Sequence, residues 1–387
     1  MLQTIAAIVF WLSLLIIFQS YIGILISLLV LRPFIAKKKS APSTWTGELP
    51  RVTVLIPAYN EEKHIQEKLE TVIHQDYPRE KVRIVVASDC STDGTNDIVR
   101  SFADGGVELV EMNERHGKNG ISDALVPTFD TDFVVITDAN VMLSPGVLHA
   151  LIDRFADPGV GVASSNLQPV IPAEGRNLEH EKTYRGFENR IKRLMSEHGM
   201  QIGAFGGLYA IRKELFQPFG DKPVHEDIIA PLEIMARGYK VVFTEKAVVY
   251  EESEPTISGE FRHRARLTSY NLNTLPRLLR LSAKAGFKAL YFAVSYKVTR
   301  WLSPYAFLFM LISSLLLARN HWFYAAVAAL GCAGLLLALF GWVLDRLRLW
   351  GWIATNAYFF VAMNVAGIFG FFRWMKGVKN YWQPRGT

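Results

Sequence analysis

Cysteine is scarce in this sequence. Among 387 residues there are two, Cys90 and Cys332. Cys90 lies in a stretch of soluble composition and Cys332 lies in a long apolar run, so we do not expect them to pair. This excludes a secreted scaffold held together by disulfides. Internal repeats, low-complexity tracts and heptad patterns are also absent from the sequence, which argues against solenoids and coiled coils.

Charged residues are missing from four long runs. These runs are Met1–Leu31, Leu302–Ala318, His321–Leu344 and Leu349–Phe372. A helix needs about 20 predominantly apolar residues to cross a bilayer. The runs therefore predict transmembrane α-helices at both ends of the chain. Between about Arg32 and Arg300 the composition is that of a soluble protein, which predicts one large extramembrane domain.

The first apolar run is interpreted as an uncleaved membrane anchor over residues 1–31. It has no basic segment before it, it is longer than the apolar part of a signal peptide, and no clear cleavage site follows. Arg32 and Lys37–Lys39 come directly after it. By the positive-inside rule these cations predict a multi-pass protein of the inner membrane whose large domain is cytoplasmic.

The C-terminal charges predict two conflicting topologies. Three spans within residues 302–372 would leave the tail outside, with Arg346 and Arg348 inside. The tail, residues 373–387, is itself basic, which favours the inside. A re-entrant run would reconcile the two. Residues 271–301, with Lys288 and Lys297 among aromatic side chains, predict interfacial helices ahead of these spans.

Strands and helices are predicted to alternate between residues 50 and 270. The predicted strands, rich in valine and isoleucine, are Val52–Pro57, Val82–Ser88, Val107–Glu111, Phe133–Thr137 and Val160–Ser164. Between the first two, Ile65, Leu69 and Val72 recur at helical spacing, with Asn60 as the expected N-cap. This alternation predicts an α/β domain with a mostly parallel sheet. In such sheets ligands bind beyond the carboxyl ends of the strands.

Polar residues follow three of these strands. Pro57–Glu62 follows the first strand, Asp89 the second, and Asp138 and Asn140 the fourth. A carboxylate at such a place can bind a polar ring or a ribose, and two oxygens two residues apart suit Mg²⁺ or Mn²⁺ bridging to phosphates. Structural interpretations stay open for each: a strand-to-helix turn, a turn in which Asp93 caps the next helix, and an Asx-turn.

Six short stretches in this order resemble the family 2 glycosyltransferases, in particular the membrane-bound branch that includes bacterial polysaccharide synthases. They are Val52–Glu62, Ala87–Thr95, Gly117–Gly120, Thr137–Asn140, Gly203–Arg212 and Glu226–Asp227. The resemblance covers about residues 50–270. It implies a nucleotide-sugar-binding, GT-A-like domain, and an inverting hexosyl- or N-acetylhexosaminyl-transferase. Such enzymes commonly use a UDP-sugar, a divalent metal (Mg²⁺ or Mn²⁺) and one carboxylate base.

The resemblance also implies roles for residues on the nucleoside side of the site. Ala58, Tyr59 and Glu61 would line the nucleoside pocket. Asp89 would contact the base of the nucleotide. Lys118 would approach the nucleoside or the diphosphate.

The resemblance also implies roles for residues near the donor sugar and the acceptor. Asp138 takes the first place of the Asp-x-Asp metal motif, and Asn140 departs from the second, so Asp138 would carry most of the metal binding. Asp227 matches the general base. Gly206 and Gly207 belong to the loop, residues 203–207, that would lie beneath the donor sugar and the acceptor.

One motif departs further from the family. Processive members carry Gln-x-x-Arg-Trp after the base, whereas this chain keeps the arginine as Arg266 and has His263 and Leu267 in place of Gln and Trp. Arg266 would bind the diphosphate. The lost Trp removes an aromatic platform for the acceptor sugar, which puts processive synthesis in doubt. Alternatively, Arg262, Arg264 and Arg266 form a basic interfacial segment that touches anionic lipid.

Two charged segments receive a simpler interpretation. Glu226 and Asp227 cannot both face the acceptor if they are in extended chain, so Asp227 is the predicted base and Glu226 a charge at a helix N-terminus. Tyr184–Arg193 is predicted to be a solvated helical face, although it could approach the acceptor.

The predicted function is transfer of a sugar to a polysaccharide or lipid-linked acceptor at the membrane. A transporter would need polar or broken helices within its spans, and these runs lack charged residues. A catalytically impaired nucleotide-sugar-binding module of a polysaccharide export or synthesis complex is the alternative, because of Asn140 and the altered arginine motif. Expected partners are the donor, the acceptor, membrane lipids and a partner subunit or second copy, but no nucleic acid.

Overall fold

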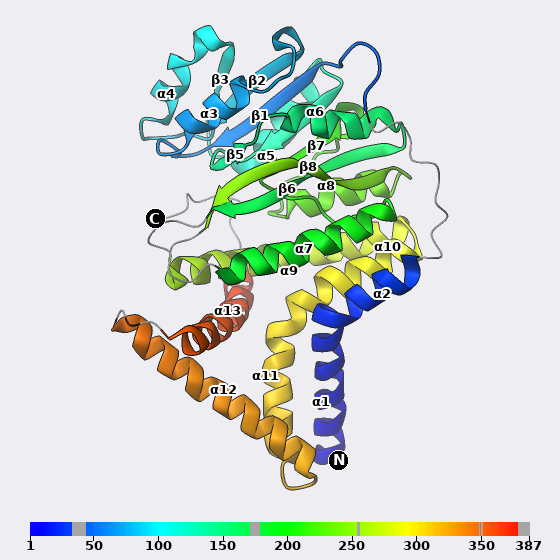
Figure 1. Cartoon of the computed structure of the whole chain (residues 1–387), viewed down its shortest axis with the longest axis vertical. Helices are drawn as coiled ribbons and strands as arrows, with labels where there is room; N and C mark the ends of the chain where they lie inside the picture. Colours follow the sequence, from blue (N-terminus) through cyan, green and yellow to red (C-terminus); the bar gives the residue numbers. More distant parts are fainter. Residues whose placement is uncertain (33–43, 171–178, 254–255, 348, 350, 378–387) are drawn as a thin grey trace.

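The computed structural model of the chain describes residues 1–32, 44–170, 179–253, 256–347, 349 and 351–377. In this structure an α/β domain lies at one end of the molecule and long apolar helices extend from it (Figure 1). The helices come from both ends of the sequence and the domain from its middle. The predicted fold class, an α/β domain with transmembrane helices at both ends, is confirmed.

In the part of the chain that the structure describes, eight strands form one mixed sheet in the order β3-β2-β1-β4-β7-β6-β8-β5. They are β1 (Val52–Ala58), β2 (Val82–Ser88), β3 (Val107–Glu111), β4 (Phe133–Thr137), β5 (Val141–Leu143), β6 (Val160–Val170), β7 (Leu208–Arg212) and β8 (Lys240–Glu252). Four of the seven pairings are parallel, and the parallel block β3-β2-β1-β4 comes from the predicted strands. The carboxyl ends of these strands therefore meet at one edge, as predicted.

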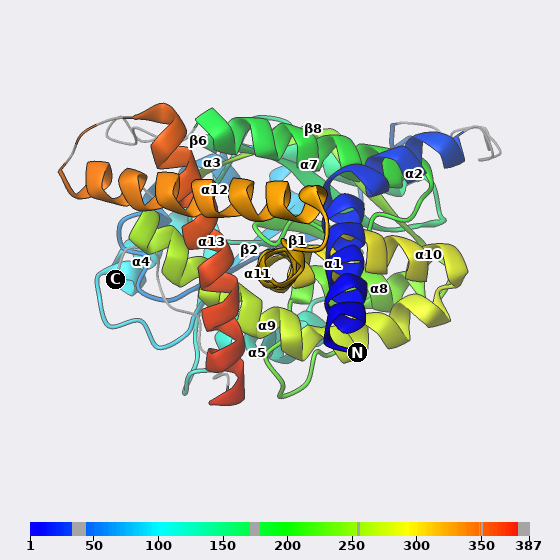
Figure 2. The same cartoon turned by 90° about the horizontal axis from the view of Figure 1, so that it is seen from below.

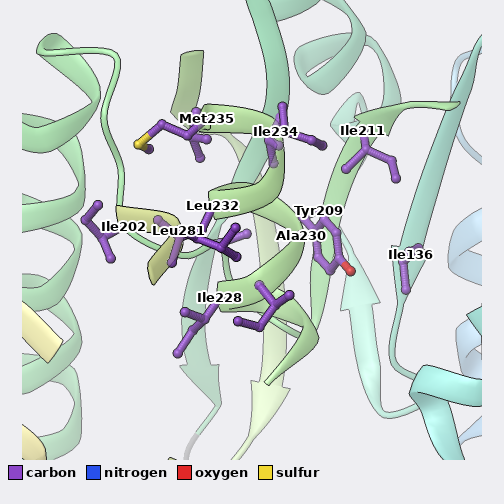
Figure 3. Close-up of a cluster of buried hydrophobic side chains, with 14 of the residues drawn as sticks. Ile136, Ile202, Tyr209, Ile211, Ile228, Ala230, Leu232, Ile234, Met235 and Leu281 are labelled. Carbon is purple, nitrogen blue, oxygen red and sulfur yellow. The ribbon is translucent and has the colours of Figure 1, made fainter. Parts of the chain in front are cut away.

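Strands β1 and β4 are buried along their whole length because both faces of the sheet are covered there, whereas the edge strand β3 exposes Glu108 and Glu111. Every residue of β1 is buried. Along β1, Val54 and Ile56 join the core on one face, whereas Leu55 joins the core on the other. Figure 3 shows part of the second core, the one that includes Leu55, with Ile228 and Leu232 of α8 (Glu226–Met235) and Tyr209 of β7 among its buried side chains.

Helices α3 (Ile65–Ile73), α4 (Thr95–Ser101), α5 (Gly117–Leu125), α6 (Val147–Ile152) and α7 (Glu179–Glu197) complete the domain. The predicted helix after β1 is confirmed as α3, but its predicted N-cap is wrong, because His64 precedes the helix. Asn60 instead has a left-handed backbone (φ 52°) and its side chain accepts a hydrogen bond from the Thr92 amide. Asn60 therefore joins the two loops that follow β1 and β2.

Among the described residues, four helical segments are long and apolar enough to cross a membrane: Leu2–Leu31, Phe287–Leu317, Trp322–Arg346 and Trp352–Met375. The first comprises α1 (Leu2–Phe18), a π-turn and α2 (Ile24–Leu31). The second comprises α10 (Phe287–Phe292), a π-turn and α11 (Thr299–Leu317), and the others are α12 and α13. Of the interfacial segment predicted over residues 271–301, residues 287–301 thus continue without a break into the first C-terminal span, whereas residues 271–284 belong to a separate helix that ends at Lys284.

Helix α9 (Ile257–Lys284) connects the sheet to these helices and passes through the predicted domain boundary at residue 270. Helix α13 (Trp352–Met375) lies against α9 and crosses α11, where the Tyr305 hydroxyl donates a hydrogen bond to the Gly367 carbonyl oxygen (3.2 Å). In Figure 2, α11 is seen end-on while α13 extends across the view. At the contact there is no room for a side chain at Gly370, because a Cβ atom there would lie 2.5 Å from Thr268 Cβ and 2.7 Å from the Ala265 carbonyl oxygen.

Candidate active site

A cavity of about 1740 Å³ lies between the carboxyl edge of the sheet and the membrane helices. Predicted site residues that line it are Glu61, Lys118, Asp138, Asn140, Gly206, Gly207, Asp227 and Arg266. Pockets for one small ligand usually measure about 300–1,000 Å³. The cavity is therefore large enough for a donor and an acceptor together.

Lys118 connects the strand ends with the start of α8. From the first turn of α5, its Nζ lies 2.6 Å from Asp138 Oδ1, 2.6 Å from the Gly206 carbonyl oxygen and 2.8 Å from Glu226 Oε1. Burial lowers the pKa of Lys118, but Asp138 and Glu226 outweigh burial and raise this pKa above its usual range. Lys118 is thus a fixed positive charge in the wall of the cavity.

A second lysine, Lys68, supports the strand end that carries Asp138. It is completely buried in α3, and its Nζ donates hydrogen bonds to Thr137 Oγ1 (2.6 Å) and to the Val141 carbonyl oxygen (2.5 Å). Burial holds the pKa of Lys68 well below its usual range. The sequence analysis missed this residue. Its signal was a lysine on the apolar face of a helix, between Ile65 and Val72.

The predicted base, Asp227, lies in the first turn of α8. The prediction that Glu226 is a charge at a helix N-terminus is confirmed, because Glu226 and Asp227 form the start of α8. The two residues are therefore not in extended chain, and both line the cavity. A Cβ atom at Gly206 would lie 3.5 Å from Asp227 Oδ2, so this glycine leaves the carboxylate accessible. His225, which was not predicted, places Nδ1 3.8 Å from Asp227 Oδ1.

Three predicted donor-binding residues lie beside the cavity and not in its lining. Ala58 is fully buried in β1, and its carbonyl oxygen accepts a hydrogen bond from the Asp89 amide. Asp89 is also fully buried, and its carboxylate accepts hydrogen bonds from Arg115 Nε (3.0 Å) and the backbone amides of residues 116 and 117. The Arg115 guanidinium lies 3.3 Å from the centre of the Tyr59 ring. Asp89 therefore holds the loop before α5, and its contact with a base stays a prediction.

The altered arginine motif lies on the face of α9 that lines the cavity. Arg266 contacts His263, with 3.2 Å between Nη2 and Nδ1. Leu267 stands where the family has Trp, and its carbonyl oxygen lies 3.3 Å from His225 Nε2. One turn later, Tyr270 also lines the cavity, with its ring centre 5.7 Å from that of His225. The cavity thus keeps an aromatic side chain close to the position of the missing Trp.

The prediction of a solvated face for residues 184–193 is wrong for two charged residues of α7. Glu188 and Lys192, one turn apart, are buried and line the cavity. Glu188 forms an ion pair with Arg300 and accepts a hydrogen bond from the Tyr296 hydroxyl (2.8 Å). The helix turns this polar face toward the membrane helices, so these residues belong to the site.

Asp138 and Asn140 both line the cavity, so both could hold a cation. No group of three or more His, Cys, Asp or Glu side chains within the described residues could hold a metal by itself. One Asp138 oxygen is engaged by Lys118, which leaves the other oxygen and the Asn140 amide oxygen. These are oxygen ligands of the kind that Mg²⁺ and Mn²⁺ accept, with donor phosphates completing the shell.

Comparisons with known proteins show similarity to glycosyltransferases. The family model "Glycosyl transferase family 2" matches residues 53–217. The chain is 26% identical over 311 residues to the probable glycosyltransferase YdaM of Bacillus subtilis, covering 77% of this chain and 71% of that protein. It is 24% identical over 233 residues to poly-β-1,6-N-acetyl-D-glucosamine synthase of Staphylococcus aureus, covering 58% of this chain and only 55% of the synthase.

A solved structure shares the fold over almost the whole chain. It is the mannosyltransferase PcManGT from Pyrobaculum calidifontis in complex with GDP-Man and Mn²⁺. The TM-score is 0.71 at 24% identity, over 97% of this chain and 99% of that chain. Residues 53–217 of this chain therefore contain a family 2 glycosyltransferase domain, and the described helices include segments that are long and apolar enough to cross a membrane.

Proposed function

We propose that this enzyme transfers a sugar from a nucleotide donor, in the first place a UDP-sugar, to a polysaccharide or lipid-linked acceptor at the membrane surface, with inversion at the anomeric carbon. The observation that carries the proposal is one cavity whose lining includes both Asp138 and Asp227 and also residues of the membrane helices. A donor bound at the strand ends and an acceptor approaching from the membrane would meet at Asp227.

The residues of the cavity support a single displacement. The carboxylate of Asp227 would take the proton of the acceptor hydroxyl, whose oxygen attacks the anomeric carbon. The bond between that carbon and the donor phosphate breaks, and its electrons leave with the nucleoside diphosphate. Lys118 and Arg266 would neutralise the charge of this leaving group. A divalent cation, Mg²⁺ or Mn²⁺, held by Asp138 and Asn140, would add positive charge at the same place.

We also propose that the catalytic domain is on the cytoplasmic side of the inner membrane. Arg32, a cation directly after α2, supports this orientation by the positive-inside rule. The lysines at positions 37–39, on which the prediction also rested, lie outside the described residues. With this orientation the catalytic domain would take its nucleotide-sugar donor from the cytoplasm.

The experiment is a donor assay with purified protein in lipid nanodiscs. Each UDP-sugar and GDP-sugar of a panel is supplied with Mg²⁺ or Mn²⁺, and release of the nucleoside diphosphate is measured. GDP-sugars are included because PcManGT, which shares the fold, was solved with GDP-Man. We expect turnover of one sugar. Donor binding without turnover would favour the impaired binding module, and the absence of any nucleotide binding would contradict the proposal.

A further inference from the structure

Several cations line the cavity on the side that faces the membrane helices, among them Lys192, Lys297 and Arg300. Lys192 comes from α7, and Lys297 and Arg300 come from the helical segment Phe287–Leu317. We call Lys192, Lys297 and Arg300 the membrane-side cationic cluster. Lys192 is only 7% exposed, although its side chain lines a cavity. Burying a lysine is costly unless an anion compensates its charge.

The cluster consists of three basic side chains, and two nearby carboxylates, Glu188 and Asp227, balance it only in part. Glu188 forms an ion pair with Arg300, but within the described ranges neither Lys192 nor Lys297 forms one. The Arg300 Nη2 atom is buried, and no hydrogen-bond partner for it is found among the described residues. Lys192 Nζ lies 5.7 Å from the Phe205 ring centre and Lys297 Nζ lies 4.9 Å from that of Tyr296. These aromatic faces attract cations but do not neutralise them.

The neighbouring positive charges affect the protonation of Lys192. Burial, followed by the charges of Lys297 and Arg185, lowers the pKa of Lys192 to about 7, and Asp227 acts in the opposite direction. An anion at the cluster would favour the protonated form. The geometry and the charge therefore agree in indicating an anion-binding site next to the base.

The donor diphosphate does not account for the cluster. Lys118, which contacts Asp138 directly, and Arg266 of α9 are the cations expected to meet the diphosphate. Lys297 lies beside the base instead: a Cβ atom at Gly203 would be 3.3 Å from the Asp227 carbonyl oxygen and 3.5 Å from Lys297 Cε. This is the side from which an acceptor would approach Asp227.

Beyond the cluster, the cavity continues between membrane helices. Its lining there includes Trp301 and Pro304 of α11 and Phe359, Phe360 and Met363 of α13. A ligand that fills both parts has an anionic group and a hydrocarbon part. A soluble polysaccharide has no hydrocarbon part to place against these side chains.

We propose that the membrane-side cationic cluster binds the phosphate of a lipid acceptor, whose hydrocarbon tail lies between α11 and α13 and whose head group presents a hydroxyl to Asp227. This inference rests on the proposed function for the role of Asp227, but not for lipid binding itself. In the transfer, the head-group hydroxyl loses its proton to Asp227 and forms the new bond to the sugar, while the nucleoside diphosphate departs. The phosphate of the lipid keeps its bonds throughout.

The test measures binding of phosphatidic acid, a lipid with a phosphate monoester head group, to the full chain. Native mass spectrometry of protein from phosphatidylcholine nanodiscs, with phosphatidic acid added in steps, gives its apparent affinity. Lys192→Met and Lys297→Met remove one charge each at similar volume, and Lys192→Arg keeps the charge. Lys288→Met is the matched control, because Lys288 is an exposed lysine of the same helical segment as Lys297 and does not line the cavity.

We expect each Lys→Met change in the cluster to weaken binding of phosphatidic acid about tenfold, since hydrogen bonds to charged groups contribute this much. Lys192→Arg and Lys288→Met should bind like the wild type, and millimolar inorganic phosphate should not compete. Equal binding by all variants, equal loss in Lys288→Met, or efficient competition by inorganic phosphate would each overturn the proposal. The donor assay on the wild type tests the proposed function separately, so the two can fail independently.

Discussion

Asn140 takes the second place of the predicted metal motif, and a carboxylate there would carry one more negative charge. Because affinity for hard cations rises with the charge of their ligands, we expect Asn140→Asp to lower the metal concentration for half-maximal donor turnover several-fold. The measurement is a titration of Mn²⁺ in the donor assay. Asn113→Asp, at an exposed position outside the cavity, should leave the curve unchanged. Coincident curves for Asn140→Asp and the wild type would mean that this position does not contact the cation.

Lys192 should lower the stability of the domain, and more so in acid. Its pKa is about 7 in the folded chain, below its usual value, so the buried charge is present in full below pH 7 and is lost as the pH rises above it. We expect Lys192→Met to raise the melting temperature more at pH 6 than at pH 9. The difference in free energy of unfolding between variant and wild type should shrink by about 2 kcal/mol over this range.

The check is thermal unfolding in nanodiscs of neutral lipid at both pH values, with Lys288→Met as the control. A gain from Lys192→Met that is the same at pH 6 and pH 9 would show that Lys192 does not titrate in this window. The groups that face it, Arg185, Lys297 and Asp227, are retained in the variant.

The sequence allowed prediction of the site residues that belong to recognisable motifs at the ends of strands. Asp138, Asp227 and Gly206 belong to this group, and the structure brings them to one cavity. Lys68 and Lys192 were missed for a physical reason. Each is a common residue on a helix, and its role depends on contacts with residues far away in the sequence. Only the packing of α3 under β4, and of α7 against the membrane helices, gives these lysines their surroundings.

At the scale of elements, the predicted strands are β1 to β4, of which β1 and β4 are fully buried, and β6. β2, β3 and β4 have the predicted bounds, β1 is one residue longer than predicted, and β6 extends beyond Ser164 to Val170. Strands β5, β7 and β8 were missed: β5 is only three residues long, β7 directly follows the glycine loop, and β8 contains Glu245 and Lys246. Their pairing is set by tertiary contacts in the mixed half of the sheet, which period-2 patterns do not reveal.

The close contact between helices α9 and α13 positions the arginine motif of α9. Because Gly370 approaches Ala265 and Thr268 so closely, Gly370→Ala should force the helices apart and destabilise the protein by about 1–3 kcal/mol. It should also slow transfer, since Ala265 lies between Arg264 and Arg266. Gly334→Ala is the matched control, because a Cβ atom at Gly334 of α12 meets open space. Melting temperature and donor turnover should both fall in the first variant alone, and unchanged values would show that the contact is adaptable.

At the scale of the whole molecule, the orientation of α13 helps to decide on which side of the membrane the C-terminal tail lies. It lies across α11 (Figure 2), and Trp374 Nε1 donates a hydrogen bond to Asn273 Oδ1 of α9 (2.8 Å). If α13 lies along the domain, α1, α11 and α12 cross the membrane and the end of α13 stays on the catalytic side. Arg373 and Lys376 would then obey the positive-inside rule.

This arrangement is tested by single cysteines in a variant without Cys90 and Cys332. With a membrane-impermeant maleimide on oriented vesicles, Lys376→Cys should be labelled from the same side as Asp104→Cys of the catalytic domain. Asn320→Cys, in the turn between α11 and α12, should be labelled from the other side. Labelling of Lys376→Cys together with Asn320→Cys would mean that α13 crosses the bilayer.

The most direct test of the account is donor turnover by Asp227→Asn. The change keeps the shape of the side chain and removes its ability to accept a proton, so acceptor-dependent release of nucleoside diphosphate should fall by about 10²–10⁴-fold. Donor binding should stay within about twofold of the wild type, and Asp221→Asn, at an exposed position, should retain full activity. Turnover by Asp227→Asn at the wild-type rate would contradict the assignment of Asp227 as the base on which the proposed function depends.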